Sequence, residues 1–198
     1  MRRITALAAI GLAALSLTGC AAIVSAPAGA YNAPSPYQVS LGREWSDMSA
    51  AAGATPKTVR LLTIDGPLLN RLYIVGPLKS GEVMFKSNVK EKPSPKIRDG
   101  MSATERMEFV TDNLTLAGFQ RLETSRPRPA KFSGADAVRF DLTGKTTEGL
   151  DLKGTAEVAD IDGKFYAIIY LAPAEHYFSA NLSEVEKVME SVHAVGKT

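Results

Sequence analysis

The sequence predicts a single α+β domain at residues 37–198, in which helices pack on an antiparallel sheet. Three observations support this fold class. Several segments alternate apolar and polar residues with a period of two, as half-buried strands do. Two other segments repeat apolar residues at helical spacing behind a capping signal. The strands come in runs instead of alternating singly with helices, which is typical of α+β folds.

The first expected elements are strands. Residues 59–64 form an apolar run that ends at the turn signal Asp65-Gly66-Pro67. Residues 68–75 predict a second strand, and residues 83–85 predict a short third one. Residues 86–101 are polar and contain two prolines, so we expect a loop there.

A helix is expected after this loop. Ser102 and Glu105 have the spacing of a capping box, in which the serine oxygen accepts a backbone N–H and the glutamate reaches back. Gly118 is a suitable C-terminal stop. Apolar residues recur between these signals on one helical face: Ala103, Met107, Val110, Leu114 and Ala117.

The second half of the chain predicts an antiparallel meander. Residues 119–126 form a candidate strand that Pro127 and Pro129 interrupt. Residues 138–143 and 150–158 alternate strictly enough to predict half-buried strands.

A hairpin and a last helix complete the predicted domain. Asp162-Gly163 is a strong hairpin signal, and the apolar run 165–171 after it predicts a central strand covered on both faces. Ser183 and Glu186 repeat the capping box, so we expect the helix to begin there. Its apolar stripe is Val185, Val188, Met189 and Val192. Three residues near the start of the domain are expected in its core or at its edge: Tyr37, Leu41 and Trp45.

The N-terminus has the features of an export signal. Arg2 and Arg3 precede an uncharged apolar run, residues 4–17, which is too short to cross a membrane comfortably. The run ends in Leu17-Thr18-Gly19-Cys20, which resembles the lipobox of bacterial lipoproteins. The resemblance implies that residues 1–19 are removed. It also implies that Cys20 receives a diacylglyceryl group and an N-acyl chain, which together give stable anchoring.

The same resemblance indicates a location. Ala21 is not the aspartate associated with inner-membrane retention, so the periplasmic face of the outer membrane is expected. Residues 20–36 are rich in alanine and proline and carry no charge, which predicts a flexible tether between anchor and domain. The rival interpretation is an ordinary secretory signal, with Cys20 incidental.

Composition limits the possible partners. Without Arg2 and Arg3, basic and acidic residues are equal in number, at 21 each, which argues against a general nucleic-acid binder. The only cysteine is the expected lipid site, so no disulfide is expected.

No catalytic constellation and no metal or cofactor site is found in the sequence. His176 and His193 are the only histidines, and neither has a histidine or cysteine partner nearby. His193 is expected at the end of the last helix. Asp160-Ile161-Asp162-Gly163 looks like the start of a calcium loop but lacks the downstream glutamate, and a hairpin explains it.

Basic residues gather on both sides of the first helix. Arg126, Arg128 and Lys131 follow it, together with Arg121, and five more precede it: Lys86, Lys90, Lys92, Lys96 and Arg98. The two groups would form one face only if strands bridge the ends of the helix. Such a face would suit anionic lipid or peptidoglycan. The alternative is a solvated loop surface.

The last third of the chain resembles the PsbP-like domains, which include DcrB-like bacterial lipoproteins. The residues that carry the resemblance are Asp162-Gly163, residues 165–171, Ala172-Pro173 and the helix end at 189–192. The resemblance implies an α/β/α sandwich and a binding or assembly role. We therefore expect a non-enzymatic envelope protein that binds a partner at the membrane. The alternatives are a hydrolase of cell-wall or lipid material and a spacer without a specific ligand.

Overall fold

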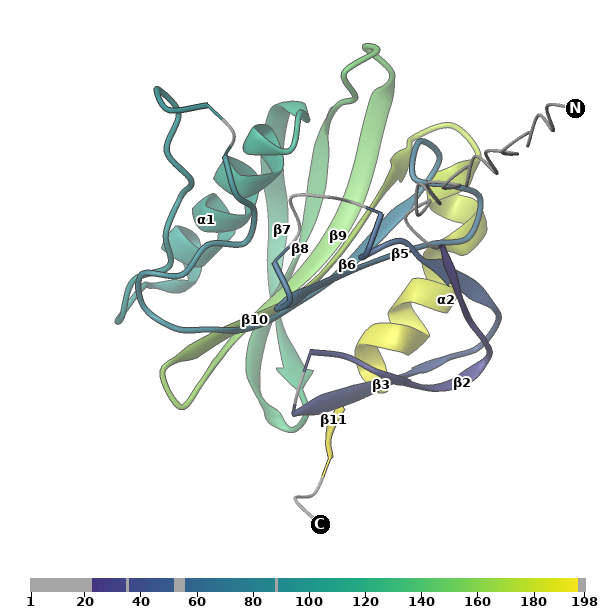
Figure 1. The fold of residues 1–198 in the computed structure, drawn as a ribbon, viewed down its shortest axis with the longest axis horizontal. Helices are drawn as coiled ribbons and strands as arrows, with labels where there is room; N and C mark the ends of the chain where they lie inside the picture. The colour runs from purple at the N-terminus through teal and green to yellow at the C-terminus, as the bar shows by residue number, and fades with distance from the viewer. Residues whose placement is uncertain (1–22, 35, 52–55, 88, 196–198) are drawn as a thin grey trace, which may run out of the picture.

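The structure is a computed structural model that describes residues 23–34, 36–51, 56–87 and 89–195 (Figure 1). The expected signal peptide and Cys20 lie outside these residues. One helix packs on each face of an eight-stranded antiparallel sheet, and a three-stranded sheet lies beside the second helix. The predicted α+β class is confirmed.

The large sheet has the order β1-β4-β5-β6-β10-β9-β8-β7. The bounds of its strands, in that order, are Val24–Ala26, Trp45–Asp47, Val59–Thr63, Arg71–Leu78, Lys164–Pro173, Asp151–Ile161, Ala135–Lys145 and Gln120–Phe132. The small sheet has the order β11-β3-β2, with bounds His193–Ala194, Tyr37–Leu41 and Gly29–Asn32. The helices are α1 (Ala103–Leu116) and α2 (Tyr177–Glu190).

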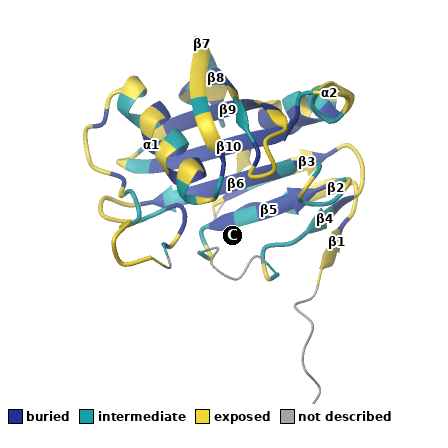
Figure 2. Cartoon of the chain, turned by 90° about the horizontal axis from the view of Figure 1, so that it is seen from above, coloured by how far each residue is buried: buried dark blue, intermediate teal, exposed yellow. Residues whose placement is uncertain are grey.

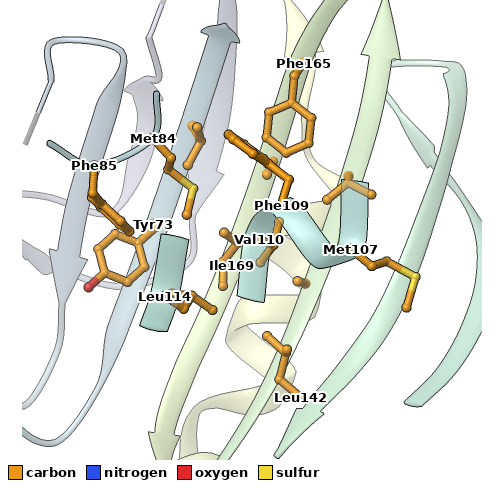
Figure 3. Close-up of a cluster of buried hydrophobic side chains, with 14 of the residues drawn as sticks. Tyr73, Met84, Phe85, Met107, Phe109, Val110, Leu114, Leu142, Phe165 and Ile169 are labelled. Atoms are coloured by element: carbon orange, nitrogen blue, oxygen red, sulfur yellow. The ribbon is translucent and has the colours of Figure 1, made fainter. Parts of the chain in front are cut away.

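Strand β10 separates two hydrophobic cores. Its residues are buried from Phe165 to Pro173, as expected for a strand covered on both faces (Figure 2). Alternate side chains enter opposite cores: Ile169 packs on the α1 side and Ile168 on the α2 side. Figure 3 shows the α1-side core, where Phe109 and Leu114 of the helix meet the sheet. The α2-side core contains Trp45, Tyr37 and Leu41, which confirms the core placement of these residues.

Helix α1 begins as the sequence predicts. The Glu105 amide donates to Ser102 Oγ at 3.3 Å, and Glu105 Oε2 accepts from the Ser102 amide at 2.8 Å. The capping box is therefore complete.

Helix α2 begins seven residues earlier than predicted, because its N-cap is residue 176 and not residue 183. Its first residue is Tyr177, so Ser183 and Glu186 lie inside the helix and form no capping box. The N-cap is His176, whose side chain caps nothing. The first turn is instead held to the sheet, because the Tyr170 hydroxyl donates to the Tyr177 carbonyl at 3.0 Å.

The tether prediction is wrong for the described part of residues 20–36. Val24–Ala26 form β1 and Gly29–Asn32 form β2, so the folded domain begins well before residue 37. The composition resembles a linker because the side chains are small. Small side chains fit here: Ala26 is buried opposite Trp45 in the β1–β4 pair.

Two further expectations need correction. Strand β7 continues through Pro127 and Pro129. It is the edge strand next to β8, and its register with β8 shifts between Ser125 and Arg128, around Pro127. Edge strands and bulges are the places in a sheet where proline is tolerated. Residues 83–85 form no strand but only one bridge, between Val83 and Lys96. Met84 and Phe85 are apolar because they cover the α1-side core.

Candidate binding surface at one end of the sheet

Four connections meet at one end of the large sheet, the upper end in Figure 1. They are the β5–β6, α1–β7, β8–β9 and β10–α2 connections, and they enclose two adjoining hollows that share Leu69 and Pro173. The wider hollow measures about 400 Å³. We call this end of the molecule the loop surface.

Two large apolar side chains are exposed on the loop surface. Leu68, in the β5–β6 connection, is 72% exposed, and Leu150, in the β8–β9 connection, is 55% exposed. Each belongs to the lining of one of the two hollows. Exposed apolar side chains that gather at loops are typical of binding surfaces.

A hydrogen-bond network centred on buried Asn70 fixes the β5–β6 connection, which carries Leu68. In the β8–β9 connection, the Leu150 amide donates to Thr146 Oγ1 at 3.2 Å. Asn70 Oδ1 accepts from the Thr63 hydroxyl at 2.9 Å and from the Ile64 amide at 2.7 Å. Its amide group donates to Asp65 Oδ2 at 2.6 Å, and Asn181 of α2 donates to the same oxygen at 3.2 Å. The β5–β6 connection is therefore tied to the start of α2.

The α1–β7 connection is held by Arg71. Its guanidinium lies 4.9 Å from the centre of the Phe119 ring, and its Nε donates to the Pro67 carbonyl at 2.6 Å. This cation–π contact joins the β5–β6 and α1–β7 connections. Glu148 and Glu175 also line the hollows, which adds carboxylates to the loop surface.

His176 lies at the rim of the wider hollow in a strained turn. Its φ is 63° and its ψ is −65°, and the Tyr177 amide donates to the Glu175 carbonyl at 2.7 Å. This is the rare γ-turn with positive φ, which costs free energy for a residue with a side chain. The ring is exposed and meets Tyr177 edge to face at 5.2 Å. The sequence gives no sign of this turn, because only the fold determines it.

The three basic residues singled out in the sequence lie elsewhere. Arg126 and Arg128 both pair with Asp141, Arg128 at 3.0 Å, and Lys131 pairs with Asp136 at 2.6 Å. All three lie on edge strand β7, next to β8.

The structure does not join these residues to the basic loop that precedes α1. Arg126 and Arg128 line a groove of about 460 Å³ on the α2 side, together with Phe178 and Leu182. The loop before α1 packs on the opposite side, where Ile97 enters the α1-side core. Arg126 and Arg128 therefore lie on the opposite face of the sheet from the basic loop.

A buried ion pair lies on the same α2-side face. Arg139 and Glu157 are opposite each other in the β8–β9 register, and their side chains approach to 2.8 Å. Glu157 is fully buried, and burial raises the pKa of its carboxyl although Arg139 opposes this effect.

The remaining candidates have structural roles. Asp160 Oδ1 accepts from the Gly163 amide at 3.1 Å, so it closes the predicted hairpin. His193 follows α2 as the first residue of β11, and its Nδ1 lies 2.9 Å from the Ser191 carbonyl. Within the described residues, acidic, histidine and cysteine side chains nowhere gather in threes as metal ligands would. The helices described there are all too short or too polar to span a bilayer.

Comparison with known proteins shows the fold. No known protein family and no curated protein matches the sequence. The cyanobacterial PsbP protein of Synechocystis has a similar structure, with a TM-score of 0.52 at 14% identity over 95% of this chain and 98% of that one. The yeast Ran-binding protein Mog1p is similar with a TM-score of 0.51 at 11% identity, over 88% and 97% of the two chains. The fold is therefore PsbP-like.

Proposed function

We propose that this protein is a lipid-anchored, non-enzymatic bacterial envelope protein that binds another protein through the loop surface. The lipobox-like residues before Cys20 support the anchor, and Ala21 favours the outer membrane. The exposure of Leu68, on a loop held by the Asn70 network, and of Leu150, on the neighbouring β8–β9 connection, supports the binding role. A partner that covers both leucines would remove their apolar surface from water.

The chemistry of the loop surface also suggests the kind of partner. Glu148 and Glu175 line the hollows beside the two leucines. A protein segment with apolar side chains next to lysine or arginine would complement both features. The similar yeast structure is described as Ran-binding, so the fold is used for protein binding in that case.

Site-specific crosslinking in cells tests this proposal. A photo-crosslinking residue is placed at Leu68, at Leu150 or, as a control, at Glu108, which is exposed on α1. We expect one protein adduct of the same mass at both leucine positions and none at Glu108. Adding Glu148→Lys and Glu175→Lys to the Leu150 probe should weaken that adduct. Absence of adducts, or equal adducts at all three positions, would contradict the binding role.

The anchor has its own test. The Cys20→Ala chain should leave the membrane fraction in high salt, whereas the unchanged chain stays there. Retention of the variant in the membrane would show that the lipoprotein interpretation is wrong.

A further inference from the structure

We propose that the β1 edge of the sheet rests on the lipid headgroups of the membrane that holds Cys20. The inference depends on the lipidation of Cys20 proposed above. It assigns an orientation: the edge formed by Val24 and the neighbouring residues Lys57 and Arg60 faces the bilayer, and the β7 edge points away from it.

The chain between the anchor and the folded domain is short. Val24 is the first residue of β1 and follows Cys20 by only four positions. An extended chain spans at most about 3.6 Å per residue, so the Cα atoms of Cys20 and Val24 lie within about 14 Å of each other. A domain of this length has a radius of gyration of roughly 16 Å. The β1 edge therefore cannot move far from the membrane surface.

The side chains at this edge suit a lipid surface. Ile23 is 61% exposed and Val24 is 54% exposed, directly after the anchor segment. Val24 shares a hollow of about 280 Å³ with Lys57 and Arg60. Asp47 lies in the same hollow, and its carboxylate accepts from the Tyr31 hydroxyl at 2.6 Å and the Ser49 amide at 2.8 Å. These bonds favour the charged form of Asp47, so Lys57 and Arg60 exceed the acidic lining of the hollow by one positive charge. Apolar side chains beside a hollow with an excess of positive charge fit the boundary between acyl chains and phosphates.

The opposite edge of the sheet lies beyond the reach of this membrane. Strands β1 and β7 are the two ends of the eight-stranded order, and Figure 2 shows them on opposite sides of the molecule. Seven spacings of about 4.8 Å separate them by roughly 34 Å along the sheet. Arg126, Arg128 and Lys131 on β7 therefore point away from the lipids around Cys20, so any ligand of theirs must come from the other side.

Fluorescence quenching in reconstituted vesicles tests the orientation. The full lipidated protein is placed in phosphatidylethanolamine–phosphatidylglycerol vesicles that contain a headgroup-attached quencher. Single cysteines for labelling are introduced at the near edge (Ser25→Cys or Lys57→Cys) and at the far edge (Lys131→Cys or Asp136→Cys). All four positions are exposed, and the acylated Cys20 does not react with the dye. We expect several-fold stronger quenching at both near-edge positions than at both far-edge positions.

The result separates this inference from the proposal on which it depends. If the unlabelled protein does not float with the vesicles, the lipid anchor itself is refuted. If the protein floats but quenching is equal at the two edges, or stronger at Lys131 and Asp136, the orientation is wrong while the anchor stands. The Cys20→Ala chain, which should not float, gives the background for all four labels.

Discussion

Single buried polar residues determine where the loops of this protein lie. Asn70 is the best example, because its side chain uses both its acceptor and its donor groups inside the β5–β6 connection. His176 shows the opposite case, since its backbone is held in an unfavourable conformation by the surrounding fold. Both residues support the loop surface.

Replacing Asn70 with Ala should destabilise the protein by about 2–4 kcal/mol. The change leaves the Thr63 hydroxyl and the Ile64 amide without their acceptor, and buried unpaired groups are costly. Urea unfolding, followed by the fluorescence of buried Trp45, measures the free energy of unfolding. Asn32→Ala is the matched control at an exposed asparagine and should stay within about 0.5 kcal/mol of the unchanged protein. Equal effects in the two variants would refute the role of the network.

Glu157 should make stability depend on pH. Its folded-state pKa is raised, so between its ordinary value and that raised value the folded chain keeps a proton that the unfolded chain releases. Stability in this window therefore falls as pH rises. Compared with Glu157→Gln, which cannot titrate, the unchanged protein should lose stability with increasing pH above about 4.5. If the unchanged protein instead gains stability relative to Glu157→Gln as the pH rises, the ion pair with Arg139 outweighs the burial of Glu157.

A helix or strand can be predicted from the local sequence where contacts among its own residues determine its structure. The capping box starts α1 at the predicted place, and the apolar run 165–171 forms the central strand as expected. The start of α2 was missed because a contact with Tyr170, distant in sequence, holds its first turn. Strand β1 was missed because its three residues gain order only by pairing with β4.

The candidate site was less predictable than the fold. The basic residues stood out in the sequence, yet Arg126, Arg128 and Lys131 are paired with carboxylates of β8. Leu68 and Leu150 looked like ordinary strand residues, and only the turn positions given by the fold expose them. Exposure of an apolar residue depends on its neighbours in space, so composition does not reveal it.

The two prolines of strand β7 should protect the edge of the sheet from pairing with a strand of another chain. Replacing Pro127 and Pro129 with Thr restores two N–H groups on the edge strand, where another chain could pair. The double variant should self-associate faster on warming, as measured by light scattering. Ser125→Thr on the same strand adds a β-branched residue without a new N–H and should behave like the unchanged protein. Identical scattering of all three proteins would count against a protective role.

The two hydrophobic cores are coupled because they lie on opposite faces of the same large sheet. Strand β10 gives alternate side chains to each side, so neither core is complete without it. Both described ends of the domain are also paired into a sheet. At one end, β1 pairs with β4 in the large sheet, and at the other end β11 pairs with β3 in the small sheet.

We therefore expect both cores to unfold in one transition. Leu114→Ala in the α1-side core should cost about 2–5 kcal/mol, since the side chain is fully buried. It should lower the urea midpoint reported by Trp45, which lies in the α2-side core, as much as the midpoint reported by circular dichroism. Two separated transitions would show that the cores unfold independently.

The strand order also has a consequence for synthesis on the ribosome. Strand β6 ends at Leu78, but its partner β10 begins only at Lys164. At ordinary elongation speeds, the intervening residues take roughly 4–17 seconds to emerge. During that interval the nascent chain carries half a sheet whose innermost strand has one unpaired, strongly apolar edge. This edge is where a holding chaperone would act on the growing chain.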